Sequence, residues 1–216
     1  MTLIPAVVCV IDDDSSVRKA LERLLRAASF SVASYASGQD FLDAYDPAIP
    51  GCVILDLEMP ELSGLGLQDA LIRAGHDPMI VFLTGRAEVP DGVRAMKRGA
   101  VEFLVKPVDD DELLAVVRRA IELDRTERSS RAQLGEIRRR IATLTPREAE
   151  VFKEVIAGKL NKQIAGKLGT VEKTVKVHRS RVMEKMQVRS LAQLVQLAAT
   201  ANVMPELAKA LSGKWS

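Results

Sequence analysis

Four short apolar runs, each ended by a polar residue, constrain what the first half of this chain can fold into. The runs cover residues 7–11, 53–55, 79–83 and 103–105, and patterns with helical spacing separate them. A fifth and less apolar run at 30–35 indicates a strand nearer a sheet edge. Short buried strands that alternate with helices favour a parallel sheet with right-handed crossovers. We therefore predict a five-stranded parallel α/β domain.

The polar residues that end these runs should lie close together, because the carboxyl ends of parallel strands meet at one edge of the sheet. Clustered carboxylates repel one another unless a cation joins them, and Mg²⁺ is the hard cation that suits oxygen ligands here. Asp56 stands alone after its strand and is the best candidate to accept a phosphoryl group as an acyl phosphate. Its expected neighbours at this edge are Asp12, Asp13, Thr84 and Lys106.

Thr84 and Lys106 are suited to bind phosphoryl oxygens, the first by a hydrogen bond and the second as a point charge. Pro107 fixes the backbone after Lys106, and a cis peptide bond is one conformation open to it. Asp14, in contrast, is expected to cap the first helix rather than to bind a metal.

The charge of the chain changes sign near residue 123. Residues 1–123 carry 12 Lys and Arg against 20 Asp and Glu, a net charge of −8, whereas residues 124–216 carry 19 against 9, a net charge of +10. This asymmetry predicts two domains with different ligands, nucleic acid being a candidate for the basic one. No apolar run approaches the roughly 20 residues that span a bilayer, and no signal-peptide pattern is present, so we expect a cytoplasmic protein without membrane contact. Cys9 and Cys52 are expected to be inert small hydrophobes in strands.

The second half has no strand pattern. Residues 145–148 form a capping box that opens a helix ending near Gly158, and a second box at 190–193 opens a helix to about residue 199. Residues 124–143 predict a charged helical linker. Its apolar positions 134, 137, 141 and 144 leave two interpretations open, a stripe that pairs with a partner helix or a solvated connector.

Two helices around Gly169-Thr170 have the proportions of a helix-turn-helix. Asn161 is expected to cap the first, over 162–168, and the second is expected over about 171–186. At about 100° per residue, one face of the second helix is apolar and should pack inward, through Val171, Val175, Val182 and Met186. The remaining surface is polar and basic, which suits a helix in the DNA major groove. The candidate DNA contacts are Lys173, Thr174, Lys176, Val177, Arg179, Ser180 and Arg181.

Segments 7–18, 52–60, 79–86 and 93–107 resemble the receiver domain of two-component response regulators. The resemblance implies a flavodoxin-like sheet of order 2-1-3-4-5 with Asp56 as the phosphoacceptor. It implies Mg²⁺ ligands at Asp12, Asp13, Asp56 and the backbone carbonyl of Glu58. It further implies a charge-pairing role for Lys106 and switch roles for Thr84 and Phe103. Glu58, Arg86 and Ala87 depart from the usual pattern, and we hypothesise that they alter the lifetime of the acyl phosphate.

Residues 141–200 resemble the LuxR-type helix-turn-helix. That resemblance implies base contacts for Lys176, Val177 and Ser180 and phosphate contacts for Thr174, Arg179 and Arg181. The predicted domains are then a receiver at 1–123, a helical linker at 124–143 and a DNA-binding domain with a carboxyl-terminal tail at 144–216.

Both resemblances together identify the chain as similar to response regulators of the FixJ/NarL group. Such a protein is no ordinary enzyme, since it catalyses only its own phosphoryl acceptance and slow dephosphorylation. The implied partners are a histidine kinase, a second copy of the phosphorylated chain, double-stranded promoter DNA and RNA polymerase.

Two other classes of protein fit part of the pattern. In a magnesium-dependent phosphohydrolase of the haloacid-dehalogenase type, the nucleophile would be Asp12, which opens a D-x-D pair. In a binding module with a degenerate receiver, no phosphoryl transfer would occur, although the full set of polar residues at the strand ends argues against this.

Overall fold

The computed structural model describes residues 5–85 and 89–203. Its chain divides into two compact units, Met1–Arg128 and Ser129–Ser216, which are called the first and second units below. Arg86, Ala87 and the predicted tail from Pro205 lie outside the described residues. None of the helices in the described segments has the length and apolar character that crossing a membrane requires.

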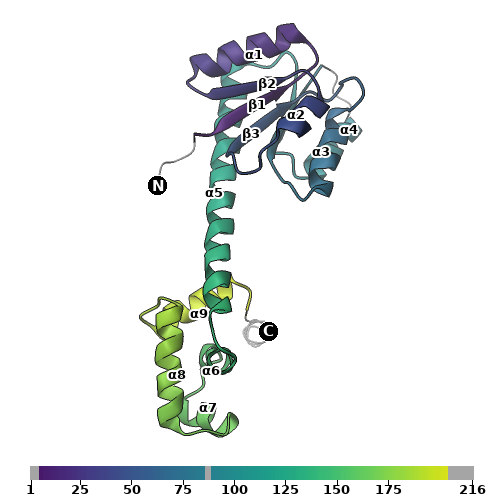
Figure 1. The fold of residues 1–216 in the computed structure, drawn as a ribbon. Coiled ribbons are helices and arrows are strands. Elements are labelled where there is room, and N and C mark those ends of the chain that lie inside the picture. The colour runs from purple at the N-terminus through teal and green to yellow at the C-terminus, as the bar shows by residue number, and fades with distance from the viewer. Residues whose placement is uncertain (1–4, 86–88, 204–216) are drawn as a thin grey trace, which may run out of the picture. The chain divides into compact units, whose positions relative to one another are not determined.

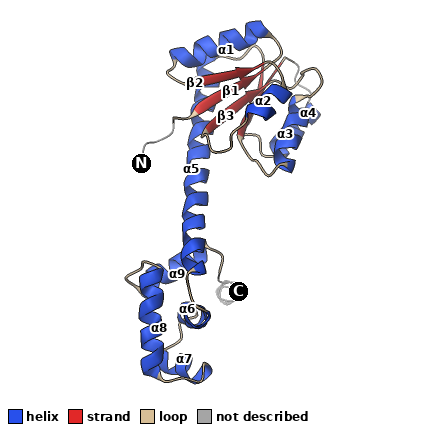
Figure 2. Ribbon diagram, in the orientation of Figure 1, coloured by secondary structure: helices blue, strands red, loops and turns tan. Residues whose placement is uncertain are grey.

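The first unit contains a five-stranded, wholly parallel sheet with helices on both faces (Figures 1 and 2). The strand order is β2-β1-β3-β4-β5, which confirms the predicted fold class. The strands are β1 (Val7–Ile11), β2 (Ser31–Tyr35), β3 (Gly51–Leu55), β4 (Met79–Thr84) and β5 (Glu102–Val105).

Five helices connect or follow these strands. Leu25 of α1 and Val117 of α5 are fully buried on one face of the sheet, whereas Phe41 of α2, Leu67 of α3 and Ala95 of α4 are fully buried on the other. Because helices cover both faces, the central strands are buried on both sides and read as continuous apolar runs. The helices are α1 (Ser15–Ala27), α2 (Gly38–Ala44), α3 (Gly64–Arg73), α4 (Val89–Lys97) and α5 (Asp110–Ala142).

The second unit has a helical core of its own. Fully buried residues at its centre include Val151, Ile164, Val182 and Leu194, one from each of the helices that follow α5. These helices are α6 (Pro146–Ile156), α7 (Asn161–Lys167), α8 (Glu172–Lys185) and α9 (Leu191–Thr200).

The predicted linker is helical, because α5 continues without a break to Ala142. Its apolar stripe packs inside the second unit: Ile137 is 2% exposed, and Leu134, Ile141 and Leu144 lie half-buried against the same core. The stripe therefore packs against the unit's own helices, through Ile137 completely and through the other three residues in part.

Two sequence predictions about helix starts in the second unit were wrong. Asn161 is the first residue of α7, not its cap; the cap position belongs to Leu160, whose N–H donates to Gln163 Oε1 at 2.9 Å. Val171 does not share the buried face of α8. It occupies the N-cap position in an extended conformation and is 65% exposed, because a residue outside the helix does not follow the helical angle per residue.

Predicted caps elsewhere are present. Thr145 and Glu148 form the reciprocal capping box, with distances of 3.3 and 2.9 Å. Asp14 caps α1 by accepting a hydrogen bond from the Ser16 N–H at 2.7 Å. In the box at Ser190, the cap itself forms, but the Gln193 side chain accepts from Arg189 N, one residue earlier than the pattern predicts.

Gly64, the first residue of α3, lies against the strand end that carries Asp56. A Cβ at this position would be 2.3 Å from the backbone oxygen of Asp56. We predict that Gly64→Ala destabilises the first unit by about 1–3 kcal/mol, because the backbone must shift to relieve the overlap. Gly66→Ala, two residues along the same helix, is the matched control, since its Cβ would meet the movable side chain of Leu62. Urea unfolding followed by circular dichroism measures both, and equal stability of the two variants would contradict the prediction.

Candidate metal centre and candidate nucleic-acid interface

Three carboxylates gather where β1 and β3 end. Asp12 and Asp13 directly follow β1, and Asp56 directly follows β3. The two strands are neighbours in register, and the Asp56 N–H donates to Ile11 O at 2.9 Å. One carboxylate oxygen from each aspartate lies within 4.8 Å of the others. Asp12 and Asp56 are buried, whereas Asp13 is exposed, so the cluster is open to solvent on one side.

Lys106, the residue directly after β5, joins this cluster. Its Nζ lies 2.7 Å from Asp12 Oδ2 and 3.3 Å from Asp56 Oδ1. The Lys106 N–H donates to Thr84 O at 2.7 Å, which fixes the lysine to the end of β4, and the following bond to Pro107 is cis. The structure thus brings together all the charged residues that the strand-end argument predicts.

The electrostatics of the cluster favour an added cation. Burial raises the pKa of Asp56, the Lys106 ammonium opposes that rise, and the Asp12 carboxylate adds to it. Burial alone would lower the pKa of Lys106, but its hydrogen bond to Asp12 and the charges of Asp12 and Asp56 raise it overall. One ammonium does not balance three carboxylates, so negative charge is left at the site.

The residues fit Mg²⁺ as its ligands. Mg²⁺ binds oxygens at about 2.0–2.1 Å, so oxygens around one ion lie about 3–4 Å apart, and the separation found here needs only a small adjustment. Glu58 is exposed, and together with Asp13 it borders a groove that reaches Arg94 of α4. The role of its backbone carbonyl as a further ligand stays a prediction.

Arg18 holds the acidic loop in place, and the sequence analysis missed it. Its guanidinium donates to the backbone oxygens of Asp12 at 2.6 Å and Asp13 at 2.9 Å. The Asp14 N–H donates to Asp12 Oδ1 at 2.9 Å. An arginine one turn into the helix that follows an acidic loop is the sequence signal that would have found it.

The two predicted switch residues lie on neighbouring strands. Thr84 is fully buried at the end of β4. Phe103 of β5 is half-buried, with its ring centroid 6.2 Å from that of Phe82. A Cβ on Gly92 of α4 would be 3.5 Å from the Phe103 ring, so this aromatic lies directly beside α4.

The α8 helix has a buried side and an open side. Val175, Val182 and Met186 are fully buried in the core of the second unit. Thr174 and Arg179 are half-buried at the edge of the open side. Exposed along the open side are the other predicted DNA contacts, Lys173, Lys176, Val177, Ser180 and Arg181.

Several polar contacts fix the position of α8. The Arg179 guanidinium donates to Asn161 Oδ1 of α7 at 3.2 Å. At the other end, Lys185 Nζ lies 2.6 Å from Glu148 Oε2 and donates to Thr143 O at 2.9 Å. The hydrogen bond from Lys185, with that from the Thr145 N–H, lowers the pKa of Glu148 to about 2. The open face is therefore presented on a helix tied to α6 and α7.

Comparison with known proteins assigns each unit. Residues 8–118 match the response regulator receiver domain, and residues 142–198 match the bacterial regulatory proteins of the LuxR family. FixJ of Bradyrhizobium diazoefficiens, a transcriptional regulatory protein, is 42% identical over 90% of this chain and 95% of its own length. Nodulation protein W of the same organism is 41% identical over 92% of this chain and 87% of its own. The solved structure of the response regulator StyR matches 90% of this chain and 98% of its own, with 42% identity and a TM-score of 0.84.

The lowered pKa of Glu148 predicts a dependence of stability on pH. The pKa of this carboxyl group is about 2 in the folded protein, whereas its ordinary value is 4.5. Its contribution to the free energy of unfolding is therefore complete above pH 4.5 and is lost as the pH falls toward 2. We expect Glu148→Gln to reduce the pH dependence of stability in this interval. Glu150→Gln, which removes a more exposed carboxylate from the same helix, is the control. Amide hydrogen exchange at Val151 and Phe152 reports on this core, and unchanged pH dependence in Glu148→Gln would contradict the prediction.

Proposed function

Because the chain belongs to the two-component response regulators that join a receiver domain to a LuxR-type DNA-binding domain, we propose that phosphorylation of Asp56 controls its binding to promoter DNA. The observation that carries the proposal is the cluster of Asp12, Asp13 and Asp56, whose oxygens lie within 4.8 Å of one another beside the Lys106 ammonium. A partner histidine kinase supplies the phosphoryl group. We assign the protein to the cytoplasm, because promoter DNA lies there.

Asp56 is assigned as the nucleophile. Its Oδ1 accepts the Leu57 N–H at 2.9 Å and faces Lys106, which assigns Oδ2 to attack on phosphorus. The phosphorus–nitrogen bond of the kinase phosphohistidine breaks, its electron pair returns to the imidazole, and an acyl phosphate forms on Asp56. The three aspartates and the Glu58 carbonyl would hold Mg²⁺, which would supply positive charge to offset the charge on the phosphoryl oxygens. The protein modifies only itself, so it is not an enzyme acting on a separate substrate.

The same geometry suggests how the signal leaves the site. A phosphoryl oxygen offers Lys106 a new partner and offers the Thr84 hydroxyl a hydrogen bond. Movement of Thr84 makes room for Phe103, whose ring lies beside α4. The adjoining surface is apolar: Val93 and Met96 of α4 and Val105 of β5 are each 44–46% exposed. We assign this surface to dimerisation of the phosphorylated receiver. Burying these apolar side chains in a dimer would stabilise the conformation in which α4 and β5 have moved.

The open face of α8 is assigned to the DNA major groove. Lys176, Val177 and Ser180 would meet base edges, while Arg181 and the edge residues Thr174 and Arg179 would meet phosphates. A dimer binds two half-sites, so phosphorylation favours paired sites at promoters, where RNA polymerase is a further partner.

A phosphohydrolase mechanism fits the geometry less well. It requires Asp12 as the nucleophile, but both of its carboxylate oxygens are engaged: Oδ1 accepts the Asp14 N–H at 2.9 Å and Oδ2 pairs with Lys106 at 2.7 Å. The degenerate-receiver alternative would predict a disrupted cluster, whereas the acids and the lysine lie together.

We predict that Asp56→Asn abolishes phosphorylation by acetyl phosphate and Mg²⁺. The amide has no carboxylate oxygen to form an acyl phosphate. Asp14→Asn is the matched control, because asparagine also caps helices well and labelling should persist. Borohydride reduction followed by peptide mass spectrometry locates the modified aspartate. Modification of Asp12 would instead support the phosphohydrolase, and labelling of Asp56→Asn would remove the site assignment.

We predict that Arg181→Ala and Lys176→Ala weaken DNA binding in different ways. Loss of a phosphate contact from Arg181 should lower affinity for all sequences alike and reduce the slope of log affinity against log salt by about 0.9. Loss of a base contact from Lys176 should cost about 1–3 kcal/mol of discrimination between selected and scrambled sites. Fluorescence anisotropy with the phosphorylated protein measures both effects. Lys153→Ala, an exposed lysine of α6, is the control, and an equal effect of this variant would refute the assignment to α8.

A further inference from the structure

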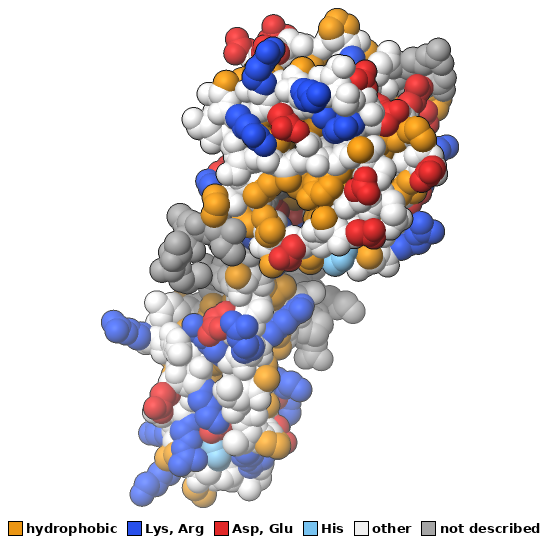
Figure 3. All heavy atoms as spheres, turned by 45° about the horizontal axis from the view of Figure 1, so that its top comes forward, with side chains coloured by type: hydrophobic (Ala, Val, Ile, Leu, Met, Phe, Trp, Pro, Cys, Tyr) orange, Lys and Arg blue, Asp and Glu red, His pale blue; other side chains and the backbone are white. Residues whose placement is uncertain are grey.

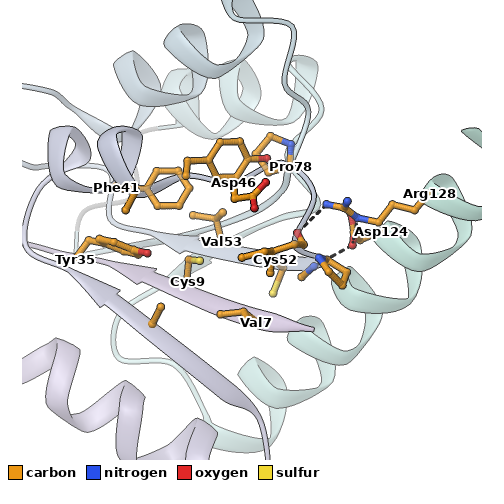
Figure 4. A pocket seen from close by; sticks show the side chains of 16 residues that line it. Val7, Cys9, Tyr35, Phe41, Asp46, Cys52, Val53, Pro78, Asp124 and Arg128 are labelled. Carbon is orange, nitrogen blue, oxygen red and sulfur yellow. Dashed lines mark hydrogen bonds and ion pairs between the residues drawn. The ribbon is translucent and has the colours of Figure 1, made fainter. Parts of the chain in front are cut away.

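A cavity of about 240 Å³ opens in the first unit, at the edge of the sheet opposite the carboxylate cluster (Figure 4). Val7 and Gly51, which begin β1 and β3, lie on its wall, whereas Asp56 follows the other end of β3. Its floor is one row of the sheet: Ala33 of β2 is paired with Cys9 of β1, which is paired with Val53 of β3. The cavity is therefore built on rigid backbone and shares no residue with the predicted phosphoryl site.

Aromatic side chains form one wall. The rings of Tyr35 and Phe41 meet edge to face at 5.4 Å, and those of Phe41 and Tyr45 lie 5.1 Å apart. The short helix α2, of 7 residues, contributes Phe41 and Ala44 to the lining. Figure 3 shows hydrophobic side chains gathered in a hollow on the surface of this unit, with acidic side chains around them.

The opposite wall is held by an ion pair on α5. The Asp124 carboxylate is 5% exposed, accepts the Gly51 N–H at 2.9 Å and pairs with Arg128 Nε at 2.7 Å. The Arg128 guanidinium also donates to Pro47 O at 2.8 Å and Ile49 O at 2.9 Å. These bonds fix the loop between α2 and β3, so the cavity is formed before any ligand binds. The charges of Asp124 and Arg128 are paired with each other and are not offered to a ligand.

The remaining polar groups define the chemistry that the cavity accepts. Burial raises the pKa of the Cys9 thiol to about 11, so it is protonated at neutral pH and lines the floor as an apolar group. Asp46 at the wall is exposed and accepts the Ala48 N–H through Oδ1 at 2.8 Å. Its carboxylate repels anions and leaves Oδ2 able to accept a hydrogen bond.

We propose that this cavity binds a neutral molecule with a single aromatic ring and a hydroxyl group. The volume exceeds the roughly 150 Å³ of an apolar protein cavity that takes up benzene and is below the roughly 300 Å³ at which pockets for drug-sized ligands begin. The ring packs against Phe41 and its neighbours in offset or edge-to-face contact, and the hydroxyl donates to Asp46. The inference does not rest on the proposed phosphorylation.

Binding can be tested with the full-length chain and ¹⁹F NMR. We expect 4-fluorobenzyl alcohol to show a broadened and shifted resonance in the presence of protein, and 4-fluorobenzoate to show none, because the Asp46 carboxylate repels an anion. Amide shifts caused by the alcohol should centre on Cys9, Gly51 and Arg128. No change in the alcohol resonance at millimolar concentration, or amide shifts centred elsewhere, overturns the proposal.

Variants that fill the cavity provide the second test. Ala33→Leu should weaken the alcohol about ten-fold or more by occupying the floor. Ala44→Leu, at the more exposed end of α2, serves as an independent filling variant if the first does not fold. Ala115→Leu adds the same side chain to the exposed face of α5 and should leave affinity unchanged. Asp46→Asn should reduce the preference of the protein for the alcohol over the benzoate. Equal affinity for the alcohol in both filling variants and in the Ala115→Leu control would refute the site.

Discussion

The position of the Lys106 ammonium between Asp12 and Asp56 is the interaction on which the first unit depends. Two buried carboxylates at neighbouring strand ends are costly without a partner of opposite charge. Lys106 supplies that charge from β5, which two strands separate from β1, and its own backbone is bound to Thr84. The charge state of one edge of the sheet is thereby coupled to the position of the β4 and β5 ends. In the proposed mechanism, a phosphoryl group that competes for Lys106 would act on this coupling directly.

The two edges of the sheet use charge in opposite ways. At the carboxyl edge, negative charge exceeds positive charge, and that excess suits the cation and the phosphoryl group that we propose for it. At the amino edge, Asp124 and Arg128 neutralise each other and bind backbone groups of the α2–β3 loop. The first arrangement leaves a net negative charge because it is unbalanced. The second is structural because it is balanced, and it leaves an apolar cavity beside it.

The strand-end residues were predictable because parallel topology alone brings Asp12, Asp56 and Lys106 to one edge. Local rules also predicted the caps at Asp14 and Thr145. Contacts between distant parts of the chain were not predictable in this way. Arg128 binds a loop 79–81 residues earlier in the chain, and neither this contact nor the cavity beside it follows from a motif in the sequence. The prediction that Val171 is buried was wrong, because a shift of one residue in the start of a helix changes which side chains face the core.

The long helix α5 contributes to two separate cores, and this fixes where it is least supported. Leu113 and Val117 are fully buried in the first unit, and Ile137 is 2% exposed in the second. Arg140 also donates to Met186 O at 3.3 Å, so the carboxyl end of α5 is an integral part of the DNA-binding unit. Between these anchored parts, residues 129–133 are all exposed. This segment therefore contributes no buried side chain to either core, and the packing that holds α5 comes from the parts on either side of it.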